Sequence, residues 1–174
     1  MITLVMGGAS SGKSAYAELL ATKATQPLYY LATMQVYDAE SAARVVRHRA
    51  MRADKSFETI ERPLDLLRLT VQQRGTLLLE DLGNLVANEL YAPDGAGEHT
   101  VKAVTDGVRH LAMQSENLII VGNEVFSGGA DYAGDTDRYL LVLAQVSNAI
   151  AAEADAVCQV TCGIPQYYKG SEPV

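Results

Sequence analysis

Residues 7–14 contain the stretch Gly7-Gly8-Ala9-Ser10-Ser11-Gly12-Lys13-Ser14, which decides the fold class. This stretch fits the pattern of a phosphate-binding loop, Gly-x4-Gly-Lys-Ser/Thr, without a mismatch. The apolar run Thr3–Met6 comes directly before it, and a helical pattern over Lys13–Ala24 follows. A glycine-rich turn that arose by chance would not require a strand before it and a helix after it. The sequence therefore predicts a P-loop nucleotide-binding fold.

Each part of this loop has a predicted task. Its glycines allow the backbone to curl, so that successive N–H groups point at phosphate oxygens, and the N-terminus of the following helix adds partial positive charge. Lys13 is a candidate catalytic residue that would bridge the β- and γ-phosphates, and the Ser14 hydroxyl would hold Mg²⁺. The candidate nucleotide-binding residues of the loop are Gly7, Gly8, Ala9, Ser10, Ser11, Gly12, Lys13 and Ser14.

Short apolar runs alternate with helical patterns along the rest of the chain. The inner runs are continuously apolar, which is typical of strands covered on both faces. Strands that alternate with helices of this length indicate a mostly parallel sheet flanked by helices, an α/β fold. The predicted strands are Thr3–Met6, Leu28–Ala32, Phe57–Glu61, Thr76–Glu80, Leu118–Val121 and Ala156–Thr161. The predicted helices are Lys13–Ala24, Ala39–Arg52, Pro63–Gln73, Gly83–Tyr91, Thr100–Gln114 and Asp135–Ala154.

Length, charge and composition limit the possible functions. With 174 residues, we expect one nucleotide-binding domain over 1–174. The net charge of −7 argues against nucleic-acid binding through overall charge, so bound phosphate must be held by a local cluster. No apolar run has the length of a membrane span, and no basic residue precedes the first one, so we expect a cytoplasmic protein. Cys158 and Cys162 fit neither a disulfide framework nor a zinc site, and Cys158 is expected to be buried in a strand.

A magnesium site needs a carboxylate opposite the phosphate loop. The apolar run Leu77–Leu79 ends on Glu80 and Asp81, at the edge of the sheet where α/β proteins bind ligands. One of these acids would anchor a water bound to Mg²⁺. We favour Glu80 for the metal role and keep Asp81 as the alternative, since either acid could instead cap the helix that follows.

A second cluster is basic and contains a histidine. Arg44, His48 and Arg52 recur at a spacing that places them on one face of the predicted helix. Two interpretations explain this spacing equally well. In the first, the basic residues form a solvated helix face that pairs with acids such as Glu40. In the functional interpretation His48 is a nucleophile towards phosphorus, because neighbouring arginines favour the neutral imidazole and stabilise phosphoryl oxygens. His99 lacks such a setting and is expected at the surface, and His110 is expected to take part in helix packing.

With both clusters, the chain resembles the bifunctional adenosylcobinamide kinase / adenosylcobinamide-phosphate guanylyltransferase family of cobalamin biosynthesis. The resemblance covers nearly the whole length. Its most specific part is the block Ala42-Ala43-Arg44-x3-His48-Arg49-x2-Arg52, which follows the phosphate loop by some thirty residues. The other matching segments are Leu4–Ser14, Tyr30–Thr33, Thr59–Glu61, Leu79–Asp81, Asn123–Val125, Ala154–Val157 and Gly163–Pro165.

This resemblance implies a RecA-like sheet, a homotrimer and two activities. The first transfers the γ-phosphate of GTP or ATP to the aminopropanol hydroxyl of adenosylcobinamide. The second transfers GMP from GTP to that phosphate through a guanylyl-histidine, and the matching residue is His48. The resemblance also implies that the nucleotide is surrounded by Leu31, Ala32, Thr33, Arg49, Ala50, Met51, Arg52 and Glu61. Glu61 is chemically suited to accept hydrogen bonds from guanine N1–H and N2–H.

Two alternatives to the bifunctional enzyme stay open. The chain departs from the family pattern after Val125, which is compatible with an enzyme that retains only one half-reaction. A nucleotide-sensing switch, whose basic face binds a partner protein, would also need the phosphate loop. Such a switch would have no need of His48, whereas a guanylyltransferase cannot lose it.

Overall fold

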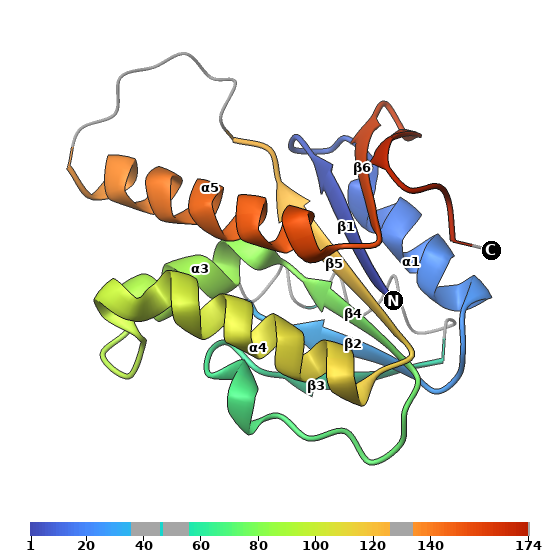
Figure 1. Ribbon diagram of the computed structural model, residues 1–174, viewed down its shortest axis with the longest axis horizontal. Helices are drawn as coiled ribbons and strands as arrows, with labels where there is room; N and C mark the ends of the chain where they lie inside the picture. The colour runs from blue at the N-terminus through green and yellow to red at the C-terminus, as the bar shows by residue number, and fades with distance from the viewer. Residues whose placement is uncertain (36–45, 47–55, 126–133, 174) are drawn as a thin grey trace.

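A single seven-stranded sheet organises the computed structural model, which describes residues 1–35, 46, 56–125 and 134–173 (Figure 1). The strand order is β3-β2-β4-β5-β1-β6-β7, and every neighbouring pair is parallel except β6 and β7. The strands are β1 (Ile2–Gly7), β2 (Leu28–Ala32), β3 (Phe57–Glu61), β4 (Thr76–Glu80), β5 (Asn117–Asn123), β6 (Ala156–Thr161) and β7 (Ile164–Lys169). The six parallel strands therefore end at one common edge of the sheet.

Helices cover both faces of this sheet. The helices are α1 (Lys13–Lys23), α3 (Leu82–Tyr91), α4 (Thr100–Gln114) and α5 (Asp135–Glu153), with short 3-10 turns η1 (Leu66–Arg68) and η2 (Gly97–His99). Figure 1 shows α3, α4 and α5 grouped together, with α1 apart from them beside β1. Each group has its own apolar core: Leu85, Val108 and Val146 lie in one, whereas Leu20 of α1 packs with Val121 in the other. These two cores make a three-layer α/β sandwich.

The structure confirms the predicted fold class and most predicted elements. Continuously apolar runs became the central strands: Leu77, Leu78 and Leu79 of β4 have no exposed surface, because helices lie over both faces. The boundaries of β2, β3, β4, β6 and α4 agree with the prediction, and those of β1, β5, α1, α3 and α5 differ by a few residues at most. Cys158 is buried in β6, as expected.

One predicted helix is wrong, and one strand was missed. Residues 63–73 contain only η1, because Asp65 has a left-handed φ of 55° and contacts made by other parts of the chain hold it there. The Asp65 N–H donates to Glu89 Oε1 (2.6 Å), and Arg62 donates to the Asp65 carbonyl. The missed strand is β7, which pairs with β6 through a two-residue turn. Tertiary contacts thus override the local helical pattern in this segment.

The predicted helix Ala39–Arg52 lies outside the described residues except for Val46, which is helical. Among the residues that are described, none of the helices is long and apolar enough to span a membrane.

Candidate nucleotide site

The phosphate loop connects the carboxyl end of β1 to the first turn of α1. Parallel partners β5 and β6 flank β1, with Gly7 level with Asn123 of β5. Gly12 precedes α1 with a left-handed φ of 92°, and Ser10 within the loop has a φ of 57°. Inside the loop, the Ser11 N–H donates to the Gly8 carbonyl (3.2 Å). The predicted strand–loop–helix unit is therefore present.

Two glycines of the loop are required by the structure. Gly12 adopts a conformation that L side chains rarely take, and a Cβ there would also lie 3.0 Å from Cα of Gly163. At Gly7, a Cβ would meet the Ser11 hydroxyl and would lie 2.8 Å from the Val160 carbonyl oxygen. A side chain at either position would therefore require the loop to move away from β6 and the β6–β7 turn.

Lys13 and Ser14 lie in the first turn of α1, directly after the phosphate loop. Lys13 is buried, and its Nζ donates to the Gly8 carbonyl at 3.1 Å, so that the cation lies against the loop. Ser14 follows in the first turn of α1 and is half-buried. A helix N-terminus with a lysine and a serine hydroxyl beside it has the donor set for a nucleotide phosphate with its metal ion.

The two acids at the end of β4 have different environments. Asp81 is the N-cap of α3, and its Oδ1 accepts the Asn84 N–H at 2.7 Å. Its Oδ2 accepts from the side-chain amides of Asn84 and Asn123, each at 3.2 Å. Glu80 is 9% exposed, and its buried Oε2 has no hydrogen-bond partner among the described residues. A buried carboxylate oxygen without a donor is a group that a bound cation would stabilise, whereas both oxygens of Asp81 already accept hydrogen bonds.

This acid lies on the same sheet edge as the loop. The strand order β4-β5-β1 places a single strand between Glu80 and Gly7, a separation of about 10 Å across the sheet. No group of three or more His, Cys, Asp or Glu residues that could hold a metal occurs in the described ranges.

The residues predicted around the nucleoside lie at the ends of β2 and β3. Ala32 is level with both Glu61 of β3 and Glu80 of β4. Leu31 is fully buried in the core, so its side chain has no exposed surface with which to contact a ligand. Thr33 is also fully buried, and its hydroxyl donates to the Asp81 carbonyl at 2.8 Å. Ala32 is half-buried and Glu61 is exposed at this edge.

The proposed nucleophile His48, with Arg49, Ala50, Met51 and Arg52, lies outside the described residues, as does Arg44. The other two histidines are in the described part of the chain. His99 is exposed at the start of α4, as predicted. His110 is half-buried and packs as predicted, with its Nε2 2.9 Å from the Leu69 carbonyl oxygen.

Sequence analysis missed two contacts at this site. Asn123 at the end of β5 holds Asp81, and the β6–β7 turn donates a hydrogen bond to the loop, from Gly163 N–H to the Ser11 carbonyl (2.8 Å). Gly163, which lies between two strand-like runs, is a turn signal that could have located the hairpin. No local pattern indicates the Asn123 contact, because Asp81 caps α3 and Asn123 ends β5, 42 residues further along the chain.

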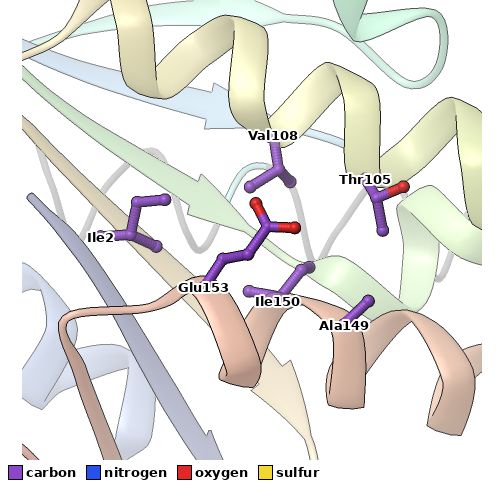
Figure 2. Close-up of a pocket in the computed structure, with 6 residues that line it drawn as sticks. All are labelled: Ile2, Thr105, Val108, Ala149, Ile150 and Glu153. Carbon is purple, nitrogen blue, oxygen red and sulfur yellow. The ribbon is translucent and has the colours of Figure 1, made fainter.

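A shallow depression elsewhere on the surface is a separate feature (Figure 2). In Figure 2, Glu153 of α5 lies between side chains of α4 and α5. The lining residues are Ile2, Thr105, Val108, Ala149, Ile150 and Glu153. Because Ile2 begins β1 and Gly7 ends it, this depression is at the amino edge of the sheet, opposite the phosphate loop.

The fold and the loop together define a P-loop nucleotide-binding protein. Residues 3–167 match the family described as cobinamide kinase / cobinamide phosphate guanyltransferase, and the chain belongs to this family. It is 31% identical to the bifunctional adenosylcobalamin biosynthesis protein CobP of Pseudomonas aeruginosa, with 100% of both chains covered. It is 33% identical to the corresponding protein CobU of Salmonella typhimurium over 94% of this chain and 97% of that one.

Among solved structures, the chain is similar to a KaiC-like protein from Pyrococcus horikoshii, with a TM-score of 0.49 and 10% identity over 91% of this chain and 71% of that chain.

Proposed function

We propose that this protein phosphorylates adenosylcobinamide with GTP or ATP and then transfers GMP from GTP to the product, giving adenosylcobinamide-GDP. The observation that carries the proposal is the site at the sheet edge: a phosphate loop with Lys13 and Ser14, faced by the buried carboxylate of Glu80 whose Oε2 has no donor among the described residues. Full-length similarity to two bifunctional proteins of adenosylcobalamin biosynthesis supports the choice of substrate.

In the kinase step, the loop holds the triphosphate and Lys13 contacts the β- and γ-phosphates. The aminopropanol hydroxyl oxygen attacks the γ-phosphorus, the bond to the β-phosphate oxygen breaks, and the hydroxyl proton passes to water. Catalysis then consists of positioning and charge stabilisation by Lys13 and the loop N–H groups. Mg²⁺ held by Ser14 and Glu80 would neutralise charge on the phosphate oxygens.

In the guanylyl step, His48 is the proposed nucleophile. An imidazole nitrogen attacks the α-phosphorus of GTP, and pyrophosphate leaves. The phosphate of adenosylcobinamide phosphate then attacks the same phosphorus, and the bond to His48 breaks, which frees the imidazole. The proposed source of positive charge for these oxygens is Arg44, Arg49 and Arg52. Ala32 and Glu61 are the proposed contacts of the guanine nucleotide at the strand ends, with the main chain of Leu31 and Thr33 and with Ala50 and Met51.

The proposal also covers domain organisation, cellular location and assembly. We propose one nucleotide-binding domain over 1–174, since all described strands share one sheet. We also propose that the protein is cytoplasmic, as expected for an enzyme of small-molecule biosynthesis, and that it assembles as a homotrimer, as the family resemblance implies.

Trapping the covalent intermediate tests the proposal most directly. The protein is incubated with Mg²⁺ and GTP labelled at the α-phosphate, then denatured and separated from free nucleotide. We expect label on the protein in an acid-labile, base-stable bond, as for a phosphoramidate, and no label on the variant His48→Ala.

The matched control is His99→Ala, which removes an exposed histidine at the start of α4 and should keep full labelling. If the wild-type protein binds GTP yet stays unlabelled, the guanylyltransferase assignment is wrong. In that case a nucleotide-sensing switch or an enzyme with the kinase step alone would explain the P-loop.

A further inference from the structure

The turn between β6 and β7 lies directly against the phosphate loop. Its Gly163 N–H donates to the Ser11 carbonyl at 2.8 Å. Gly12 is so close to the same turn that a Cβ on it would lie 3.0 Å from Gly163 Cα. Val160 of β6 approaches Gly7 in the same way, through its carbonyl oxygen. The contact is therefore backbone against backbone, which side-chain rotation cannot relax.

The hydrogen bond to Ser11 has a direct consequence for the loop. The Ser11 carbonyl and the Gly12 N–H belong to one planar trans peptide unit, so they point in opposite directions. When Gly163 holds the carbonyl on one side, the Gly12 N–H is directed to the other side of the loop. Phosphate binding by such a loop depends on the direction of these N–H groups.

A second contact joins the hairpin to the first turn of α1. The hydroxyl oxygens of Tyr16 on α1 and Tyr167 on β7 are 2.7 Å apart. Burial raises the pKa of both hydroxyls above the ordinary value for tyrosine, so both stay protonated at neutral pH. The hairpin thus holds α1 as well as the loop that precedes it.

The position of Gly163 is set by the shape of the turn. Cys162 and Gly163 both have left-handed φ values, 52° and 78°, between the paired residues Thr161 and Ile164. Positive φ at both central residues is the pattern of a tight turn whose twist matches the flanking strands. A β-branched residue at Gly163 opposes this φ, and a changed turn would move the N–H that binds Ser11.

We propose that Gly163 is a positioning residue for nucleotide phosphates, and that the β6–β7 hairpin braces the phosphate loop through Gly163 and Tyr167. This inference rests on the proposed function, because it assumes that the loop binds a nucleotide. It adds a role for a part of the chain that touches neither phosphate nor metal in the proposed mechanism.

The test compares two glycines with left-handed φ. Gly163→Val strains the turn that contacts the loop, whereas Gly97→Val introduces the same strain at a φ of 57° before α4. The two variants are matched because no atom lies within 4 Å of a Cβ at either position. Dissociation constants for GDP and GMP with Mg²⁺ are measured by calorimetry, and melting temperatures are measured alongside. We expect Gly163→Val to weaken GDP binding about tenfold, the effect of one charge-assisted hydrogen bond, and GMP binding less, because GMP lacks the β-phosphate.

Gly97→Val should lower the melting temperature to a similar extent and change GDP binding less than about twofold. Equal GDP affinity in the two variants would overturn the brace. If the wild-type protein binds no GDP, the proposed function is wrong, and the brace with it. If the wild type binds GDP and the two variants bind it equally well, only the brace is wrong.

A milder pair of variants keeps the test decisive if Gly163→Val does not fold. Tyr167→Phe removes the hydroxyl that contacts Tyr16, whereas Tyr168→Phe removes the neighbouring hydroxyl, which donates to Gln159 Oε1 at 3.2 Å on the other face of the hairpin. We expect about threefold weaker GDP binding for Tyr167→Phe and no change for Tyr168→Phe. Equal GDP binding by both variants would contradict the proposal.

Discussion

The phosphate loop and the end of β4 lie at the same edge of the sheet, but different interactions hold them. The loop takes its shape from backbone geometry, with Gly7 and Gly12 placed where a side chain would be strained or blocked. The end of β4 is held by side chains from other elements: Thr33 after β2, and Asn123 at the end of β5. A substitution in the loop should therefore act mainly on nucleotide chemistry. At the end of β4, one acid should affect chemistry and its neighbour stability.

The largest expected effect is in the loop, from Lys13→Ala. The variant removes the buried cation that lies against the Gly8 carbonyl and would meet the β- and γ-phosphates. We expect γ-phosphate transfer to adenosylcobinamide to fall by about a thousandfold or more, measured as kcat in a steady-state assay. The free energy of unfolding should change little, because the lysine contact is a single hydrogen bond to a loop carbonyl.

A lysine at the other end of the same helix provides the control. Lys23 is exposed and forms an ion pair with Glu172 at 3.5 Å. An exposed ion pair contributes little to stability, so Lys23→Ala should leave both kcat and unfolding close to the wild type. A loss of less than about tenfold for Lys13→Ala would contradict the assigned role of the loop.

The loop could be predicted from the sequence because its determinants are local. Glycine spacing, the lysine, and the flanking strand and helix all lie within 24 residues, and each restricts backbone conformation directly. The same holds for the central strands, whose continuous apolar runs require cover on both faces. Local patterns of this kind are sufficient to establish the α/β fold class.

The contacts that the sequence did not indicate are long-range. The pattern over residues 63–73 is helical, yet Glu89, from α3, fixes Asp65 in a left-handed conformation. In the same way, the sequence does not separate the roles of Glu80 and Asp81, whereas in the structure Asp81 accepts hydrogen bonds from Asn84 and Asn123 and Glu80 Oε2 has no donor among the described residues. Such differences depend on which distant residue supplies a hydrogen-bond donor, and periodicity contains no information about that.

At the end of β4, the expected effect on chemistry is intermediate and comes from Glu80→Gln. The amide has the same shape but loses the negative charge that would hold Mg²⁺ through water. We expect kcat to fall about 10- to 100-fold, the usual effect of losing a residue that orients a metal ligand. The apparent affinity for Mg²⁺ in the same assay should fall as well.

Protein stability is the second measurement on this variant. Since Glu80 Oε2 has no donor among the described residues, neutralising the side chain should not lower the melting temperature and could raise it. Unchanged kcat together with unchanged Mg²⁺ dependence would remove Glu80 from the site and leave the metal without a protein carboxylate at this strand end.

The smallest expected effect on catalysis comes from the neighbouring acid, with Asp81→Ala. This variant removes the N-cap of α3 and the acceptor of two side-chain amides, so we expect unfolding to become easier by about 1–2 kcal/mol. For a chain of this length, each kcal/mol lowers the melting temperature by about 2–4 °C. Asp81→Asn keeps a side chain that caps helices well, so its loss in free energy of unfolding should be about half that of Asp81→Ala or less. Because Asp81 is expected to stabilise the fold, kcat should remain within about threefold of the wild type at a temperature where the variant is folded. A loss of kcat of about 100-fold with little change in stability would instead assign the metal role to Asp81 and the structural role to Glu80.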